Sequence, residues 1–423
     1  MTILAYGSQG PAVSLLQAAL NRGRYGALTV DGIFGRATER AVKAFQERNS
    51  LAATGIVNEK TQSRLMPLIT GYDTYTIHSG DTFYLVAQKY GTTAERITVA
   101  NPSLDPANLI PGTKIIVPLS TNVVFTNIPF TSEALAYAVD GLTKRYPFIK
   151  SEVIGTSVLG TPITALTIGS GERKVSFNAS HHANEWITTP VLMKFLEEYA
   201  AAFSENRHIC CRSAAELFES ATLYVVPMVN PDGVDLVTGL IEKGSDAYNA
   251  ALAMNGGGRR FPEDWKANIN GVDLNLQYPA GWEQAREIKF SQGYTQPGPR
   301  DYVGNAPLDQ PESYAMAEYT IREDFDITLS YHTQGEIIYW RYLDYLPEDS
   351  YRIALALSNI SGYALETTPY NSGFAGYKDW FIYKFDRPGY TIEAGLGTNP
   401  LPISQFDKIY GDNRCMLALA LYI

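Results

Sequence analysis

The chain has 423 residues, of which 45% are hydrophobic and 18% are charged, and its formal net charge is -10. This composition supports two or three domains with buried cores and excludes a largely disordered protein. The acidic balance argues against nucleic acid as a partner, and no uncharged apolar stretch is long enough to cross a membrane.

The first seven residues contain no basic region followed by an apolar run, so no signal peptide is visible. The chain has three cysteines, Cys210, Cys211 and Cys415, and adjacent cysteines rarely bridge each other. We therefore expect free, buried or partly buried thiols rather than a disulfide. Such thiols suit a reducing compartment.

Residues 3–67 carry a compact helical pattern. Apolar residues from Val13 to Leu20 are spaced for one helix face, and Thr38 is expected to cap a second helix. Between them, residues 30–35 form a glycine-rich loop in which we expect Phe34 to be buried. The ordered patterns LQxxL, DGxFGxxT, AVxxFQ and TGxVxxxT resemble the small three-helix peptidoglycan-binding domain. The resemblance implies a binding domain over residues 1–70, and a helical spacer is the alternative.

Residues 74–119 form a second small unit of strand, two helices and strand. The segment from Tyr75 to Thr82 alternates like a short strand that ends in a turn, and Phe83 to Tyr90 has helical spacing. The patterns YxxxxGDTxxxxAxxYG, NP and LxPGxxxxxP resemble a LysM domain. The resemblance implies that residues 71–120 bind glycans containing N-acetylglucosamine, in peptidoglycan or in chitin.

The remaining residues, 121–423, alternate between strand and helix patterns. Strands are predicted at 151–156, 163–168, 174–180, 221–229, 326–331 and 389–393. Helices are predicted at 132–145, 188–203, 311–324, 350–360 and 404–422. This alternation predicts an α/β domain with a mixed sheet and helices on both faces. Ligands of such domains gather beyond the carboxyl ends of the strands.

Four side chains with suitable chemistry follow predicted strands of this domain. His182 and Glu185 follow the strand at 174–180, while His332 and Glu393 follow the strands at 326–331 and 389–393. Two histidines and one carboxylate, with a fourth position open for water, suit a catalytic zinc ion. The HxxE spacing alone is common, and a surface pair is the alternative interpretation.

Five ordered motifs strengthen the metal interpretation. They are HANEW at 182–186, NPDG at 230–233, GVDLN at 271–275, SYHTQ at 330–334 and TIEAG at 391–395. Together they resemble the zinc carboxypeptidase family, with the carboxypeptidase A-like fold, over essentially all of residues 121–423. The resemblance implies that His182, Glu185 and His332 bind Zn²⁺ and that Glu393 acts as general base and then general acid. We assign no direct role to His181.

The chain departs from the family pattern at two positions that handle substrate charge. The family's arginine that clamps a free terminal carboxylate corresponds to Leu276, next to Asn275, and leucine cannot form a bidentate ion pair. The family's oxyanion-stabilising arginine corresponds to Lys266, which keeps the charge but loses the planar fork. Simple removal of C-terminal residues is therefore in doubt.

Other expected substrate contacts also come from matched positions. Tyr370 and Asn371 lie near the family's mobile tyrosine, and we assign that position to Tyr370. Lys378 corresponds to the position that faces the specificity pocket, where it would favour a substrate side chain with a carboxylate. Asn275 and one of Arg259 or Arg260 are expected to hold other carboxylates, and we choose Arg260. A solvated turn is the alternative for the arginine pair.

Because of these departures and the two binding modules, the chain resembles the bacterial γ-D-glutamyl-diaminopimelate peptidases within the zinc carboxypeptidase family. The resemblance implies hydrolysis of the amide between D-glutamate, through its γ-carboxyl, and meso-diaminopimelate in peptidoglycan stem peptides. A wall-tethered metallocarboxypeptidase for ordinary peptides and a non-catalytic glycan-binding protein are the alternatives. The expected partner is peptidoglycan. The expected location is a bacterial cell wall, or the interior of the cell in connection with sporulation.

Overall fold

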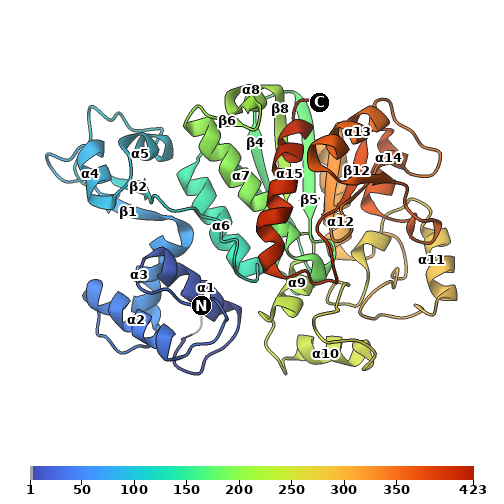
Figure 1. Ribbon diagram of the computed structural model, residues 1–423, viewed down its shortest axis with the longest axis horizontal. Helices are drawn as coiled ribbons and strands as arrows, with labels where there is room; N and C mark the ends of the chain where they lie inside the picture. The colour runs from blue at the N-terminus through green and yellow to red at the C-terminus, as the bar shows by residue number, and fades with distance from the viewer. Residues whose placement is uncertain (1–2) are drawn as a thin grey trace. The chain divides into compact units, whose positions relative to one another are not determined.

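The computed structural model describes residues 3–423, and the chain divides into two compact units. The first unit comprises residues 1–129 and 133–150, and the second comprises residues 130–132 and 151–423 (Figure 1). The expected domain boundaries near residues 70 and 120 stay a prediction. No helix within the described residues is long and apolar enough to cross a membrane.

Three helices build the start of the first unit: α1 (Pro11–Arg22), α2 (Arg36–Arg48) and α3 (Glu59–Thr70). Phe34 is buried as expected. Thr38, however, is not a helix cap, because α2 is capped by Gly35. The buried Thr38 hydroxyl instead lies 3.3 Å from the amide nitrogen of Gln17, whose side chain also bonds the glycine-rich loop. A buried amide needs these partners, which outweighs the capping preference of threonine.

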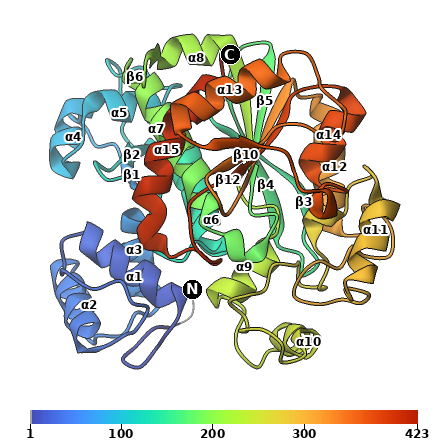
Figure 2. The same ribbon diagram turned by 45° about the vertical axis from the view of Figure 1, so that its right-hand side comes forward.

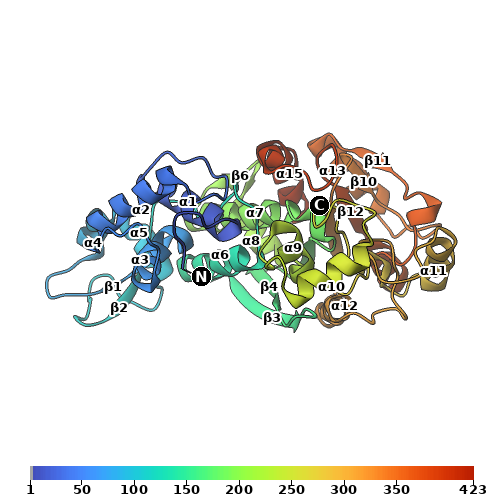
Figure 3. The ribbon, with the colours of Figure 1, turned by 90° about the horizontal axis from the view of Figure 1, so that it is seen from below.

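The predicted strand–helix–helix–strand unit is present. Its elements are β1 (Tyr72–Thr76), α4 (Phe83–Tyr90), α5 (Ala94–Ala100) and β2 (Lys114–Pro118). The strands pair antiparallel, with Tyr75 opposite Ile115, and Figure 3 shows them side by side. Thr82 and Thr93 cap the two helices, and Asn101 fixes β2 by accepting a 2.9 Å hydrogen bond from the backbone of Ile116. Helix α6 (Ser132–Arg145) follows, and from Glu133 onward it belongs to the first unit.

The second unit is organised around an eight-stranded mixed sheet in the order β11-β10-β12-β9-β5-β8-β4-β3. The strands are β3 (Lys150–Thr156), β4 (Pro162–Gly169), β5 (Arg173–Ala179), β8 (Ala221–Val226), β9 (Ile327–His332), β10 (Ile337–Tyr339), β11 (Ala364–Glu366) and β12 (Gly389–Glu393). The central strands β12, β9, β5 and β8 run parallel to one another. Strand β4 pairs antiparallel with β8, and β10 pairs antiparallel with β12. The expected mixed sheet is confirmed.

Helices cover both faces of this sheet. The helices of the second unit are α7 (Thr188–Ser204), α8 (Ala214–Ser220), α9 (Pro231–Thr238), α10 (Asp246–Asn255), α11 (Trp282–Ser291), α12 (Pro311–Glu323), α13 (Ser350–Ser361), α14 (Tyr377–Phe385) and α15 (Phe406–Ala420). Figure 2 shows α7 and α15 on one side of the strands and α12 and α14 on the other. The central strands are buried on both faces, although they alternate apolar residues with small polar ones such as Ser176, Thr328 and Thr391.

The predicted strands and helices of this domain are present, with small shifts at their ends. The predicted strand at 221–229 stops at Val226, because Pro227 has no amide hydrogen for the ladder. The short strands β10 and β11 and the helices α8, α9, α10, α11 and α14 were not predicted. Apolar and charged residues are mixed around α14, and its first six residues are all buried, so no helical periodicity reveals it.

The expectation of free thiols is wrong for two of the three cysteines. Cys210 and Cys415 form a disulfide between positions 205 residues apart, and Cys211 stays free and exposed. Cys210 lies in the turn between the short strands β6 (His208–Ile209) and β7 (Arg212–Ser213), while Cys415 lies on α15. Only the folded chain brings these segments together. The disulfide also removes the argument for a reducing compartment.

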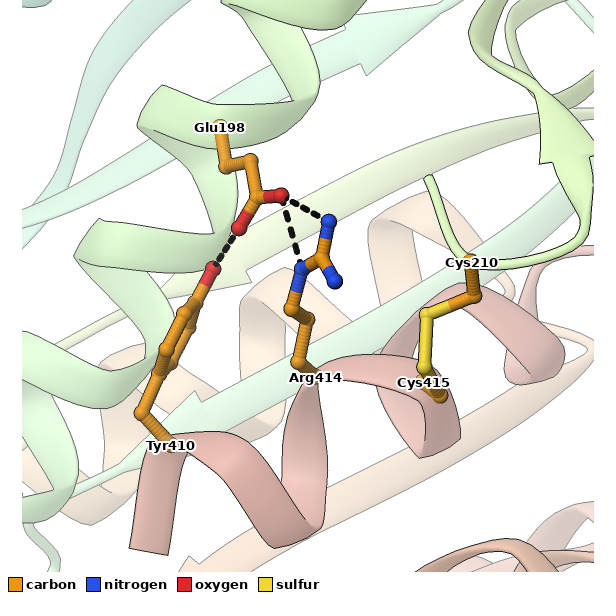
Figure 4. Close-up of a disulfide and its surroundings, with 5 residues drawn as sticks. All are labelled: Glu198, Cys210, Tyr410, Arg414 and Cys415. Atoms are coloured by element: carbon orange, nitrogen blue, oxygen red, sulfur yellow. Dashed lines mark hydrogen bonds and ion pairs between the residues drawn. A yellow bond between two sulfur atoms is a disulfide. The ribbon is translucent and has the colours of Figure 1, made fainter. Parts of the chain in front are cut away.

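The disulfide lies beside a polar contact between α7 and α15. Glu198 of α7 accepts a 2.5 Å hydrogen bond from the Tyr410 hydroxyl and a 2.7 Å bond from Nε of Arg414 (Figure 4). Helix α15 is therefore held by a covalent bond and by an ion pair. The loop before α15 carries Asn399, which borders the site described below.

Candidate metal centre

The sheet topology brings the expected metal ligands to one edge. Strands β5, β9 and β12 are neighbours and run parallel, so their carboxyl ends lie together. His182 and Glu185 follow β5 in a short 3-10 turn, whereas His332 is the last residue of β9. Glu393 is the last residue of β12 and pairs in register with His332. Strand order thus places all four residues around one point.

Three of these side chains converge tightly. The Nδ1 atoms of His182 and His332 lie 3.0 Å apart, and each lies 2.9 Å from an oxygen of Glu185. All three residues are buried, and their ligand atoms lie within 4.8 Å of one another. Two ring nitrogens that face each other beside a carboxylate are arranged to share one cation. The two-histidine, one-carboxylate donor set fits catalytic zinc.

The electrostatics of the cluster also favour a cation. Burial raises the pKa of Glu185, but His182 and His332 outweigh this effect and bring the pKa below its usual value. Burial and the neighbouring charge of Glu185 raise the pKa of Glu393 to about 8. A bound cation stabilises nearby carboxylates, so it would shift the pKa of Glu393 downward again. A bound metal ion would therefore stabilise the cluster by offsetting the negative charges of Glu185 and Glu393.

Asp273 orients one of the histidines. Its Oδ1 atom lies 3.1 Å from Nε2 of His182, and its Oδ2 atom lies 3.2 Å from the ammonium group of Lys266. When Nε2 donates to this carboxylate, Nδ1 carries the lone pair that a metal needs. Burial opposes the ionised form, but Lys266 and His182 hold the pKa of Asp273 well below its usual value. Sequence reasoning quoted the GVDLN motif but gave its aspartate no role.

Lys266 lies at the border of the metal cluster. Its backbone carbonyl accepts a 3.0 Å hydrogen bond from Ala183, which fixes the turn carrying Glu185. Burial lowers the pKa of Lys266, but Asp273 and Asp301 outweigh burial and raise the pKa above its usual value. The side chain is therefore a permanent positive charge beside the expected position of the substrate carbonyl.

Two cavities meet at this cluster. One has a volume of about 410 Å³ and the other about 940 Å³. The residues that line both are His182, Lys266, Arg300, Tyr339 and Glu393. A substrate that occupies both cavities would cross the cluster at their junction. This arrangement fits cleavage within a bound chain.

The smaller cavity contains two of the expected substrate contacts. Lys378 is 3% exposed and forms an ion pair with Asp379, and its ammonium group donates a 2.7 Å bond to the carbonyl of Arg341. Asn275 lines the same cavity and accepts a 2.9 Å hydrogen bond from the backbone of Tyr377. Leu276 also lines it and supplies an apolar wall. The cavity therefore combines one apolar side with a buried ion pair.

The other two expected contacts lie farther from the cluster. Tyr370 is 63% exposed, packs its ring against Phe374 and borders a separate hollow of about 140 Å³. Its neighbour Asn371 lines the smaller cavity instead. Arg260 lines the larger cavity, but its exposed side chain pairs with Asp264 at 2.7 Å. Arg260 therefore shares a cavity with the metal cluster, whereas Tyr370 borders a different hollow.

Several charged residues at the cavities were not anticipated. Arg300 lines both cavities, and Asp301 pairs with both Arg300 and Lys289. These residues lie in segments without a recognised motif, so no sequence signal identifies them. His181, in contrast, is buried and turns its Nε2 atom toward the hydroxyl of Tyr278 at 3.0 Å. It contributes no atom to the cluster.

The chain matches three protein families. Residues 136–415 match the zinc carboxypeptidase family, residues 9–65 match a peptidoglycan binding domain family, and residues 75–118 match the LysM domain family. These matches support binding of peptidoglycan or a related glycan by the first unit. They also support a cell-wall association.

Individual relatives agree with these matches. The γ-D-glutamyl-L-diamino acid endopeptidase 1 of Lysinibacillus sphaericus is 45% identical over 282 residues, which is 67% of this chain and 69% of that protein. An uncharacterized Bacillus subtilis protein is 42% identical over 295 residues, which is 69% of this chain and 77% of that protein. The structure of bovine thrombin-activatable fibrinolysis inhibitor has a TM-score of 0.52 at 18% identity, and the match covers 69% of this chain and 95% of that chain. This last likeness shows the fold alone.

Proposed function

Because the chain belongs to the zinc carboxypeptidase family, we propose that this metallopeptidase hydrolyses the γ-D-glutamyl-meso-diaminopimelate amide of peptidoglycan stem peptides. The relative from Lysinibacillus sphaericus, named for γ-D-glutamyl-L-diamino acid bonds, is 45% identical over 67% of this chain. The observation that carries the proposal is the smaller cavity, where the metal cluster lies beside a buried ion pair and lacks the family's carboxylate clamp.

The proposed chemistry divides among residues at the cavity junction. His182, Glu185 and His332 hold Zn²⁺, which when bound polarises a carbonyl and makes a water molecule a better nucleophile. Glu393 takes the proton of the attacking water and later donates it to the leaving amine. Lys266 places its positive charge where negative charge develops on the carbonyl oxygen.

The smaller cavity supports a diamino acid as the leaving group. The buried pair of Lys378 and Asp379 presents a positive and a negative charge side by side. The far end of meso-diaminopimelate carries a carboxylate and an ammonium group on one carbon, so it matches both charges. Asn275 offers a further polar contact, and Leu276 cannot hold a terminal carboxylate. These features disfavour an ordinary carboxypeptidase.

The first unit supplies attachment to the substrate polymer. We assign residues 1–70 and 71–120 to two binding domains and residues 121–423 to the catalytic domain. Binding of one module raises the local concentration of stem peptides near the cleft without a new catalytic contact. The disulfide between Cys210 and Cys415 favours the cell wall over the reducing cytoplasm, during growth or sporulation.

A substrate comparison tests the proposal. The protein is incubated with L-Ala-γ-D-Glu-meso-diaminopimelate and with an ordinary peptide, each with and without a chelator. Chelator-sensitive release of diaminopimelate alone supports the proposed function. Trimming of the ordinary peptide would instead indicate a conventional carboxypeptidase, and wall binding without hydrolysis would indicate a glycan-binding protein.

A second comparison tests the role of the ion pair. A tripeptide with L-lysine in place of meso-diaminopimelate keeps the ammonium group but lacks the distal carboxylate. If Lys378 binds that carboxylate, cleavage of the lysine peptide should be slower by about 10- to 100-fold. Equal rates for both peptides would remove Lys378 from substrate recognition.

Sedimentation of the chelator-treated protein with purified peptidoglycan or chitin identifies the polymer that the first unit binds.

A further inference from the structure

We propose that Arg300 binds a substrate carboxylate beside the scissile amide and so replaces the clamp that Leu276 cannot provide. The inference rests on the proposed function, because it concerns the same cleft and an anionic stem peptide. Arg300 lines both cavities, as does the base Glu393. Its guanidinium group therefore borders the junction where the cleaved bond would lie.

The backbone holds Arg300 rigidly beside the reactive residues. The carbonyl of Pro299 accepts hydrogen bonds from Lys266 at 2.8 Å and from Ala267 at 3.0 Å. On the other side, the carbonyl of Tyr302 accepts a 2.8 Å bond from Asp273. Arg300 is thus fixed between the segment that carries the cationic Lys266 and the segment that orients His182.

The side chain of Arg300 is only partly used by the protein. Its Nε atom donates a 2.6 Å hydrogen bond to Asp301, whose other oxygen accepts a 2.7 Å bond from Lys289. Among residues 3–423, no hydrogen-bond acceptor contacts the two terminal nitrogens of Arg300. A guanidinium group held at Nε still offers a planar pair of donors that matches a carboxylate.

Each neighbouring lysine of the cleft also has an acidic partner. Lys266 pairs with Asp273, Lys378 pairs with Asp379, and Lys289 pairs with Asp301. Asp301 pairs with Lys289 as well as with Arg300. If Arg300 served only to hold Asp301, its two terminal nitrogens would have no function. An incoming carboxylate is the chemical group that those donors fit.

Two substrate carboxylates lie close enough to the scissile amide to be the ligand. One is the α-carboxylate of D-glutamate on the acyl side, and the other is the carboxylate next to the amide nitrogen on the diamino acid. The test therefore uses three peptides: the parent tripeptide, its D-isoglutamine form, and the form amidated at the diamino acid carboxylate. Values of kcat/KM are measured for the full-length zinc-loaded wild type, Arg300→Gln, Arg300→Lys and Arg322→Gln.

Arg300→Gln should lower kcat/KM for the parent peptide by on the order of 10- to 100-fold, as expected when a partly screened charge pair is lost. In one of the two amidated peptides, the amide replaces the carboxylate that Arg300 binds. The wild type should cleave this peptide with a kcat/KM that is lower by a similar factor, and Arg300→Gln should lower that kcat/KM no further. Arg300→Lys should fall between, because it keeps the charge without the fork. Arg322 is exposed and pairs with Glu152, so Arg322→Gln should match wild type.

Equal loss for all three peptides in Arg300→Gln, with normal zinc content and melting temperature, would mean a structural role and would overturn the inference. An unchanged kcat/KM for the parent peptide would overturn it as well. If wild type cleaves none of the peptides, the proposed function fails and this inference fails with it. Cleavage by wild type without a substrate-dependent effect at Arg300 rejects this inference alone.

Discussion

Replacement of Asp273 by asparagine should weaken either zinc binding or turnover, although no metal ligand changes. The two oxygens of Asp273 face two donors, the Nε2 atom of His182 at 3.1 Å and the ammonium group of Lys266 at 3.2 Å. An asparagine side chain has one oxygen and one amino group. In either orientation the amino group therefore faces a donor, and one charged hydrogen bond becomes a repulsive contact.

The expected magnitude follows from these contacts. A hydrogen bond to a charged group contributes about 1.5–3 kcal/mol, and each 1.4 kcal/mol corresponds to about tenfold in an equilibrium constant. If the amino group faces His182, zinc affinity should fall by roughly 10- to 100-fold, which is the range for loss of a residue that orients a ligand. If it faces Lys266, zinc affinity should persist and turnover at saturating zinc should fall instead.

Two measurements distinguish these outcomes. Zinc affinity is determined by competition with a chromophoric chelator, and kcat is measured on the tripeptide with excess zinc. Asp246→Asn is the matched control, because Asp246 is exposed on α10 and should leave both values unchanged. If Asp273→Asn binds zinc and turns over like wild type, the proposed orientation of His182 and Lys266 by Asp273 is wrong.

Further predictions concern the base, the disulfide and a buried carboxyl group. Glu393→Gln should retain zinc but lose turnover by roughly a hundred- to ten-thousand-fold, measured by metal analysis and kcat, and near-normal turnover would exclude Glu393 as the base. Cys415→Ser breaks the bond to Cys210 and should lower stability by about 2–4 kcal/mol in calorimetry, whereas Cys211→Ser should have no effect. Burial raises the pKa of Glu312 to about 7 from 4.5 in the unfolded chain. Its contribution to stability is therefore complete below about pH 4.5 and is lost as the pH rises through about 7, by up to ~3 kcal/mol. Urea unfolding should show this decline in wild type and a flatter profile in Glu312→Gln, and parallel profiles would contradict the assignment.

The metal cluster was predictable because each member follows a strand with a strong local pattern. His182, His332 and Glu393 come at or just after strands that are largely buried and alternate apolar with polar residues. Parallel neighbouring strands end at the same edge of a sheet, so local signals and one topological rule place these residues together. The mixed sheet and the helices α7, α12, α13 and α15 follow from the same alternation of patterns.

Side chains whose placement depends on irregular or unpredicted segments were not predictable in this way. Lys378 was expected from matched position, but its buried pairing with Asp379 and its bond to Arg341 depend on the unpredicted helix α14. Tyr370 was chosen over Asn371, yet the fold directs Asn371 to the cavity. A one-residue difference on an irregular loop has no periodicity that could decide it.

The sequence by itself indicated the metal donor set of this protein and predicted a base beside it, all at the ends of predicted strands. Only the tertiary structure decided the surroundings of that chemistry: the carboxylate of Asp273 behind His182, the free donors of Arg300 at the cleft, and the bond between Cys210 and Cys415. The physical reason is the distance along the chain between the residues that interact. Strand and helix patterns arise from neighbouring residues, whereas these contacts join segments whose proximity depends on the order of strands in the sheet.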